Sequence, residues 1–351
     1  MGNVSNRISS IDALKGFAIF TVVIGHVIAN FFESWSNTVN ETPIAMFWWQ
    51  LVYIFHMPLM MFISGYLFLS SRVQKDNAIH VWWHKAQPLV LPFITMGVVV
   101  YLLRNQKDSY WYLRTLLEFI TIQLIYEYIR SKWKLGLKSD IVFLLVSCFL
   151  VTRYLGKFYA VSYFDLIVDI GHIQWVWFYF NAGVLFRRYQ LFQRIRNVSH
   201  LDSLLLLVLV IYCCFTVGQT GGGTFRQCLA LFKQPFILCG LTSFFIAFEK
   251  YNPSSLIMKV FQYLGQHTLE IYLLHLFFLL KICFVGNYII ELCNMTVQTG
   301  TMQYQLTALT IEILLAVTLS IVNVALCAAI YEPLKAFPLV YRLFLGRKLI
   351  N

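Results

Sequence analysis

A lysine and a histidine share one face of an otherwise apolar segment, residues 11–32. Lys15 and His26 are eleven residues apart, which on an α-helix is about three turns plus roughly 20°, or about 16 Å along the axis. Asp12 lies one turn before Lys15. Ionisable side chains inside an apolar helix are costly, which favours a functional role. We therefore predict that His26 is a general base acting on a hydroxyl group, with Lys15 and Asp12 as further catalytic residues.

Two other histidines lie in apolar segments. His56 is part of FHMPLMMFISGYLF (55–68), in which Ser64 and Gly65 permit close contact between helices. His275 ends the segment LGQHTLEIYLLH (264–275). We predict that both histidines bind substrate. The alternatives are structural: His56 is a hydrogen-bonded histidine at a proline kink, and His275 only makes packing contacts between helices. For the first segment, the alternative is that Lys15 extends to the membrane interface and His26 is a hydrogen-bonded buried histidine.

Aromatic rings and polar side chains alternate in two further segments, YWYLRTLLE (110–118) and HIQWVWFYFNAG (172–183). Such a mixture suits a carbohydrate, which offers apolar edges to the rings and hydroxyl groups to the polar side chains. An aromatic belt at the membrane interface is the alternative explanation. The substrate-binding candidates are Trp111, Arg114, Glu118, His172 and Trp175, with Gln174, Trp177, Asp165 and Asp169 as their neighbours.

The elements that must position these residues are membrane-spanning helices. Hydrophobic residues make up 59% of the chain and charged residues 12%, about half the charge of a soluble globular protein. We predict an all-α polytopic membrane protein with a single domain, residues 1–351, and about ten transmembrane helices. The apolar stretches are roughly 11–32, 44–70, 88–103, 110–129, 140–156, 170–187, 201–218, 227–248, 258–284 and 304–331.

The net charge of +11 indicates orientation in the membrane rather than nucleic-acid binding. With the N-terminus inside, the cytoplasmic segments hold 18 of the 27 Lys and Arg residues, so the positive-inside rule predicts that both termini are cytoplasmic. The basic loops can also contact anionic lipid. We do not expect the first segment to be a cleaved signal peptide, because its apolar core is too long.

Several kinds of site are not predicted. The eight cysteines show no metal-ligand spacing and most fall in the apolar stretches, so we expect no metal; Cys293 alone is expected in a loop. No GxSxG, HExxH or P-loop motif occurs, which argues against a hydrolase with a serine nucleophile. Pro88 and Pro92 are predicted to open the third span.

Four segments, in order, resemble the membrane acyltransferase-3 family, the O-acyltransferases of bacterial surface glycans. RISSIDALKGFAIFTVVIGHV resembles its first helix, in which a basic residue precedes a catalytic histidine, here Lys15 and His26. FHMPLMMFISGYLF is similar to its second helix, YWYLRTL to its W-[FY]-L-x-x-L segment, and LGQHTLEIYLLH to its hSLxIYLLH segment.

The resemblance implies an acyl-coenzyme A donor, usually acetyl-CoA. The family often has Arg-x-x-Arg before Leu-x-x-Pro at the start of the third helix, but HKAQPLVLP keeps Lys85 and has Pro88 at the second basic position. The candidates for binding the donor are therefore Lys15, Lys85 and His84.

These observations predict an O-acetyltransferase of the bacterial inner membrane. It would move an acetyl group from acetyl-CoA to a hydroxyl of a surface polysaccharide or lipid-linked sugar. The alternative is a multi-helix transporter or flippase of lipid-linked glycans, which ten helices around a polar cavity would fit equally well. The sequence shows no internal repeat of the kind found in many transporters, which favours the enzyme.

Overall fold

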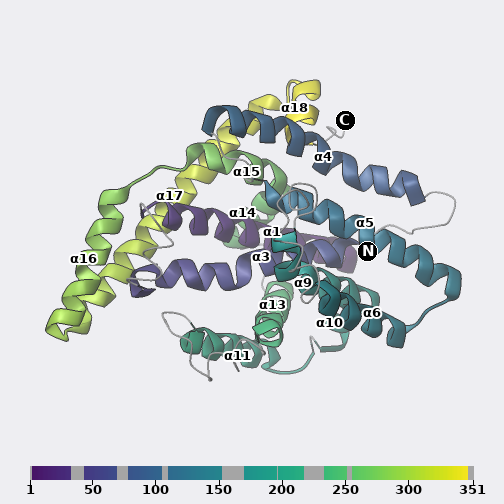
Figure 1. Cartoon of the computed structure of the whole chain (residues 1–351), viewed down its shortest axis with the longest axis horizontal. Helices are drawn as coiled ribbons and strands as arrows, with labels where there is room; N and C mark the ends of the chain where they lie inside the picture. The colour runs from purple at the N-terminus through teal and green to yellow at the C-terminus, as the bar shows by residue number, and fades with distance from the viewer. Residues whose placement is uncertain are drawn as a thin grey trace. The chain divides into compact units, whose positions relative to one another are not determined.

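The computed structural model describes residues 2–32, 43–68, 78–104, 110–151, 170–195, 197–216, 233–250 and 255–346. Every regular element within these ranges is helical, which confirms the all-α prediction (Figure 1). The elements are α1 (Gly2–Ala29), η1 (Pro43–Met46), α3 (Phe47–Phe68), α4 (Ala78–Arg104), α5 (Trp111–Trp133), α6 (Leu137–Leu150), α9 (Ile170–Arg188), α10 (Leu191–Ile195), α11 (Leu201–Thr216), α13 (Lys233–Lys250), α14 (Leu256–Gln266), α15 (Thr268–Leu274), η4 (His275–Phe278), α16 (Cys283–Thr299), α17 (Met302–Leu334) and α18 (Pro338–Leu345).

Four of the described helices are long and apolar enough to cross a membrane: Ser9–Ala29, Phe47–Phe68, Ile79–Leu103 and Met302–Leu334. The pair Thr268–Phe278 and Cys283–Thr299, which is bent by 86°, would make a fifth span. In α1 and α3, 67% of the most apolar window is buried, against 22% in α4 and 28% in α17. The helices that carry His26 and His56 are therefore interior helices, while α4 and α17 present wide apolar faces outward.

The chain forms two compact units. The first contains residues 1–60 and 195–330, and the second contains residues 61–194 and 331–351. Helices α3 and α17 contribute residues to both units. The single domain and the count of ten spans stay predictions.

The first unit is built on very close contact between α1 and α14, which lie side by side (Figure 1). A Cβ atom added to Gly16 would lie 1.9 Å from the Phe261 carbonyl oxygen, and one added to Gly265 would lie 1.7 Å from the Asp12 carbonyl oxygen. Only residues without a side chain permit this backbone contact. It fixes the helix that carries Lys15 and His26 against the segment that leads to His275.

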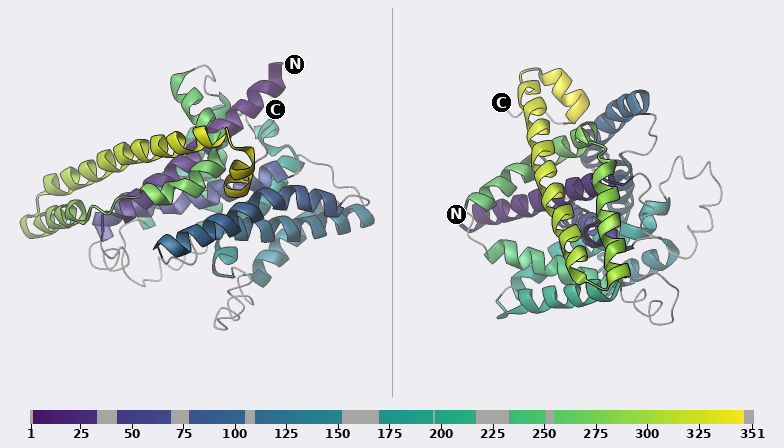
Figure 2. Two further views of the ribbon diagram at one scale, coloured as in Figure 1. Left: turned by 90° about the horizontal axis from the view of Figure 1, so that it is seen from above. Right: turned by 90° about the vertical axis from the view of Figure 1, so that its left-hand side faces the viewer.

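The ninth predicted span is wrong as a single helix. The structure divides residues 258–284 into α14, α15 and η4, and α16 then follows at the 86° bend. Figure 2 shows α16 leading into α17 through a tight connection, where Gly300 ends α16 with a φ of 70°. Cys293, expected in a loop, is buried in α16.

The second unit contains α4, α5, α6, α9 and the end of α3. The prediction that Gly65 permits close helix contact is confirmed, because a Cβ there would lie 1.9 Å from the Phe180 carbonyl oxygen of α9. The prediction that Pro88 and Pro92 open the third span is wrong. Both lie inside α4, which begins at Ala78. A proline removes one helical hydrogen bond, and a helix in a membrane protein tolerates that loss when neighbouring groups satisfy the freed carbonyl.

Candidate active site

The structure brings three predicted histidines together in the first unit: His26 of α1, His56 of α3 and His275 at the start of η4. The ring centroids of His26 and His275 are 5.2 Å apart, with a tilt of 46° between the planes. His56 is close enough to His26 for the two rings to interact electrostatically. We call these three residues the histidine cluster.

Backbone carbonyl groups determine the tautomers of two of these rings. Nδ1 of His56 lies 2.8 Å from the Val52 carbonyl oxygen, and Nδ1 of His275 lies 2.8 Å from that of Tyr272. A carbonyl oxygen only accepts, so each Nδ1 must carry the proton and donate it. In the neutral rings, Nε2 is then an acceptor. Nε2 of His275 has no hydrogen-bond partner among the described residues.

Exposure distinguishes His26 from the other two. His56 is 2% exposed and His275 is 1% exposed, whereas His26 is half-buried. His26 is thus the member of the cluster with the most accessible surface. Tyr53, one turn before His56, contacts it edge to face, with 4.5 Å between the ring centroids.

Sequence reasoning missed the residue that positions His275. The Nδ2 group of Asn323 on α17 donates to the His275 carbonyl oxygen at 3.0 Å. Asn323 belongs to a buried stripe along α17, whose members recur every three or four residues. They include Ala308, Glu312, Ala316, Ser320, Asn323 and Cys327. In the sequence, three polar residues of this stripe within an apolar helix, Glu312, Ser320 and Asn323, were the pattern that could have indicated a functional face.

Lys15 and Asp12 form an ion pair in α1. Nζ of Lys15 lies 3.0 Å from Oδ1 of Asp12, and their side chains are 22% and 19% exposed. The local charge at this end of α1 is therefore balanced. Their predicted roles in catalysis and in binding the donor stay predictions.

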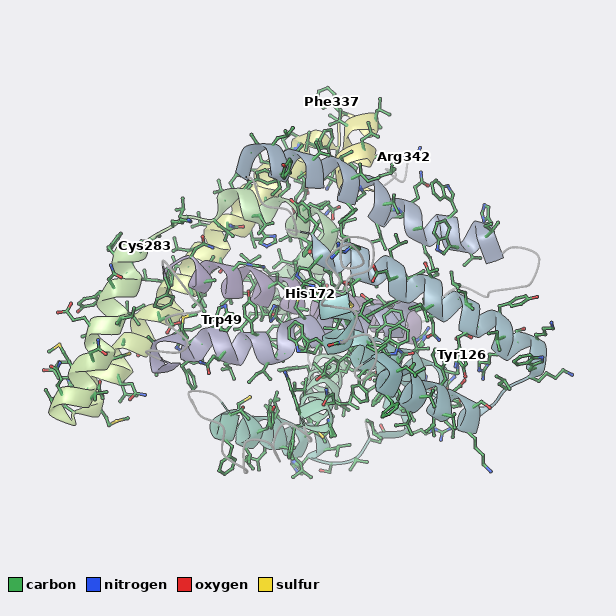
Figure 3. The ribbon with its side chains drawn as sticks, in the orientation of Figure 1. Trp49, Tyr126, His172, Cys283, Phe337 and Arg342 are labelled. Carbon is green, nitrogen blue, oxygen red and sulfur yellow. The ribbon has the colours of Figure 1, made fainter. Side chains whose placement is uncertain are left out.

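In the second unit, the two aromatic segments meet. The Trp111 and His172 rings stack at 3.9 Å between centroids with 13° between their planes, and Trp175 lies 6.5 Å from Trp111. All three are half-buried, and His172 is labelled in Figure 3. We call Trp111, His172 and Trp175 the aromatic cluster. Gln174 belongs to the same stretch of α9, and its buried Nε2 has no partner in the described part of the chain.

Not every neighbour belongs to this surface. Trp177 is 2% exposed, packs on Phe119 and donates to Ser147, so its ring lies in the packed interior and not on the surface of the aromatic cluster. Arg114 and Glu118 are half-buried and lie one turn apart on α5. Asp165 and Asp169 lie outside the described residues.

The predicted donor-binding residues of α4 differ in their surroundings. Nζ of Lys85 donates to the Phe68 carbonyl oxygen at 3.1 Å and lies 5.0 Å from the centre of the Phe68 ring. A cation is favoured there, because the carbonyl groups at a helix C-terminus are negative and α3 ends at Phe68. His84 is exposed.

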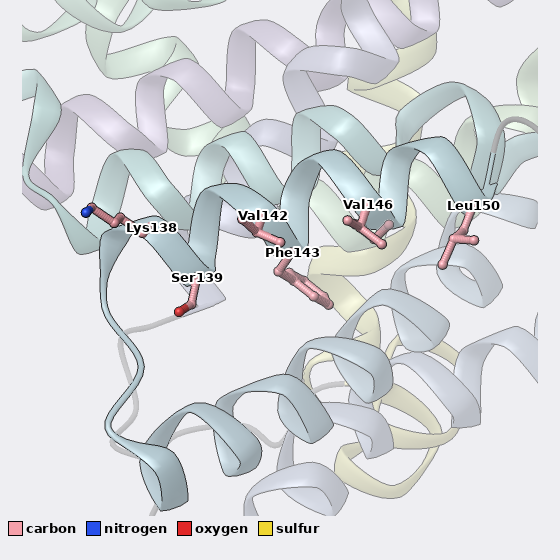
Figure 4. Close-up of a pocket in the computed structure, with 7 residues that line it drawn as sticks. Lys138, Ser139, Val142, Phe143, Val146 and Leu150 are labelled. Carbon is pink, nitrogen blue, oxygen red and sulfur yellow. The ribbon is translucent and has the colours of Figure 1, made fainter.

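A groove of about 440 Å³ lies along α6 (Figure 4). Its lining is mostly apolar and includes none of the predicted site residues: Lys138, Ser139, Val142, Phe143, Val146, Ser147 and Leu150. We therefore do not assign the chemistry to this groove. Among the described residues, no three His, Cys, Asp or Glu side chains are placed to hold a metal ion.

Comparison with known families identifies the class of protein. The family described as "Acyltransferase domain" matches residues 8–332, a range that contains the whole histidine cluster. The chain belongs to the membrane acyltransferase-3 family. Residues 8–332 therefore form an acyltransferase domain of this family.

Two curated relatives of this acyltransferase are both named nodulation protein NolL. The protein from Sinorhizobium fredii is 28% identical over 187 residues, which cover 45% of this chain and 49% of the relative. The protein from Mesorhizobium japonicum is 31% identical over 101 residues, which cover 29% of this chain and 26% of the relative. The matches thus span half or less of either relative. No solved structure matches this acyltransferase.

Proposed function

We propose that this acyltransferase moves an acetyl group from acetyl-CoA to a hydroxyl group of a surface polysaccharide or lipid-linked sugar in the bacterial inner membrane. The observation that supports this most directly is the histidine cluster, which is an imidazole with accessible surface next to two buried imidazoles. Family membership supplies the reaction class, because an acyltransferase needs an acyl donor and an acceptor. The proposal includes ten spans and cytoplasmic termini.

His26 is the general base in this proposal. It accepts the proton of the acceptor hydroxyl group while the hydroxyl oxygen forms a bond to the carbonyl carbon of the thioester. The carbon–sulfur bond breaks, and the His26 imidazolium returns the proton to the coenzyme A sulfur. The Nε2 acceptor of His275 is available to a second hydroxyl group of the sugar, which positions the attacking hydroxyl group beside His26.

The donor is a polyanion, so its binding requires cationic groups. Lys15 and Lys85 are proposed to provide positive charge, and the exposed His84 is proposed to donate an additional hydrogen bond to the coenzyme. Lys15 already balances Asp12, and Lys85 already contacts the carbonyl end of α3. Both ammonium groups therefore keep a fixed position before the donor binds, which lowers the ordering cost of binding.

The test is acetyl transfer by His26→Ala, compared with His26→Gln and the wild-type enzyme. Removal of a general base lowers turnover by roughly 10²–10⁴-fold. Acetyl content of the surface glycan, measured by mass spectrometry, and the amount of enzyme in the membrane are read from the same cells. Near-normal acetylation by either variant would exclude His26 as the base. A wild-type enzyme that moves a glycan across the membrane without acetylating it would favour the flippase alternative.

A further inference from the structure

A carboxyl group on α17 is enclosed by protein without a partner. Glu312 is 0% exposed, and neither of its carboxyl oxygens has a hydrogen-bond partner among the described residues. Buried polar groups are nearly always hydrogen-bonded, and an unsatisfied one costs free energy in either protonation state. A group that is costly to the fold and unused by it is a candidate for binding something else.

Aromatic side chains of α3 lie close to the turn of α17 that precedes Glu312. The Trp48 indole Nε1 donates to the Leu309 carbonyl oxygen at 2.8 Å, one turn before Glu312. The next residue, Trp49, stacks on Tyr53 with 4.1 Å between ring centroids (Trp49 is labelled in Figure 3). These three rings are half-buried, so they keep accessible surface. On the α16 side, Cys293 is close enough to Glu312 to interact with it electrostatically.

The aromatic residues connect this carboxyl group with the histidine cluster. Tyr53 contacts both Trp49 and His56, and α3 rises about 10 Å from Trp49 to His56. Along α17, Glu312 and Asn323 lie on the same face, about 16 Å apart. Glu312 is therefore too far from His26 to take part in bond making. It lies nearer the start of α17, on the face that also carries Asn323, the residue that contacts His275.

We propose that Glu312, with Trp48 and Trp49, forms a distal acceptor subsite that binds a hydroxyl group of a saccharide whose acetylated hydroxyl group lies at His26. This inference depends on the proposed function. Because Glu312 is enclosed by protein, the side chains around it must move apart for a sugar hydroxyl group to donate to a Glu312 oxygen, and the sugar ring then packs on the indoles. The acceptor must then contain more than one sugar unit to reach both places.

Proton transfer does not require Glu312. In acetyl transfer the proton that leaves the hydroxyl group ends on the coenzyme A sulfur, so no net proton has to leave the site. A proton relay from the histidine cluster to Glu312 would therefore have no proton to transfer. Acceptor binding instead gives the carboxyl oxygens the partner that the described residues do not supply.

The experiment compares Glu312→Gln, Glu312→Leu and Ser320→Ala in the purified full-length enzyme. Ser320 is the matched control, since it is also buried on α17 but already donates to the Ala316 carbonyl oxygen. The probe is a set of oligosaccharides released from the surface glycan of a strain that lacks this enzyme. We expect Glu312→Leu to raise the acceptor KM about 10- to 100-fold and Glu312→Gln less, with kcat and the KM for acetyl-CoA nearly unchanged.

A binding measurement without turnover separates the two proposals. Oligosaccharide binding, followed by quenching of tryptophan fluorescence, should weaken in parallel in the Glu312 variants and stay normal in Ser320→Ala. Unchanged acceptor KM and unchanged binding in Glu312→Leu would overturn the subsite while leaving acetyl transfer intact. A wild-type enzyme that neither binds nor acetylates the oligosaccharides would overturn both. A fall in kcat rather than a rise in KM would also contradict a distal subsite.

Discussion

The His26 and His275 rings lie 5.2 Å apart, and the Nδ1 proton of His275 is directed to backbone carbonyl oxygens. This arrangement leaves the His275 Nε2 as an acceptor next to the reacting histidine. We expect His275→Phe, which keeps an aromatic ring, to lower kcat about 10- to 100-fold, because the sugar loses the acceptor for the hydroxyl group next to the attacking one.

An Asn323 variant distinguishes an effect on the position of His275 from a general effect on folding. Asn323→Ala removes the 3.0 Å hydrogen bond to the His275 carbonyl oxygen, so it should lower kcat by a smaller factor than His275→Phe. In the double variant the two effects should not add, since both act through the same ring. Thermal unfolding in detergent reports folding separately. Additive losses of activity, or losses that follow the unfolding temperature, would contradict the assignment.

The Lys15–Asp12 ion pair leads to a prediction about binding of the acyl donor. Lys15→Met leaves the Asp12 carboxylate without its cation, whereas Lys15→Arg keeps the charge. If Lys15 serves the coenzyme electrostatically, the KM for acetyl-CoA should rise in the Met variant and rise less in the Arg variant. The measurement is turnover and KM per folded molecule. Equal values for Arg, Met and wild type would remove Lys15 from the site, and a loss of protein level alone would indicate an interfacial role.

The close contact between α1 and α14 gives a prediction about stability. Gly265→Ala would place a methyl group 1.7 Å from the Asp12 carbonyl oxygen, so the helices must separate. We expect a loss of about 1–3 kcal/mol in unfolding free energy. Gly97→Ala is the control: this glycine lies inside α4 with open space around it, and alanine there should stabilise by roughly 0.5–1 kcal/mol. Equal thermal midpoints for the two variants would contradict the packing argument.

The sequence predicted individual helices better than their contacts. Helical spacing placed Lys15 and His26 on one face, but only the fold shows that His26 lies next to His275, almost 250 residues later. The close approach of Gly16 and Gly265 is a property of two backbones, and no residue near either glycine indicates its partner. Such pairings depend on tertiary packing, which periodicity along one chain does not contain.

Helix α16 was missed for a different reason. It contains Asn287, Glu291, Asn294 and Gln298, which interrupt the continuous apolar stretch expected of a spanning segment. Its buried residues, Gly286, Ile289, Leu292 and Cys293, nevertheless fall on one face. A search for amphipathic rather than uniformly apolar helices would have found it. Glu312 was not singled out from the sequence, because a lone carboxyl group in a long apolar helix has no charged neighbour in the sequence that would indicate a site.

The aromatic cluster supplies the last prediction. Trp111 stacks on His172 at 3.9 Å and Trp175 lies nearby, so three half-buried rings from the starts of α5 and α9 form one surface. If this surface binds the acceptor, Trp111→Ala and Trp175→Ala should each raise the acceptor KM by roughly 5- to 150-fold, the range that 1–3 kcal/mol of lost stacking would give. The KM for acetyl-CoA should stay unchanged.

An aromatic belt predicts a different result for the same variants. Belt residues anchor helices at the membrane interface, so their loss should affect insertion or stability and leave acceptor kinetics intact. Trp133→Ala is the matched control, because Trp133 lies at the other end of α5 and is 65% exposed. If Trp111→Ala and Trp133→Ala change only protein level, and by similar amounts, the cluster is an interfacial anchor. A rise in acceptor KM confined to Trp111→Ala and Trp175→Ala means that the rings contact the glycan, since an anchor would have no reason to affect one substrate alone.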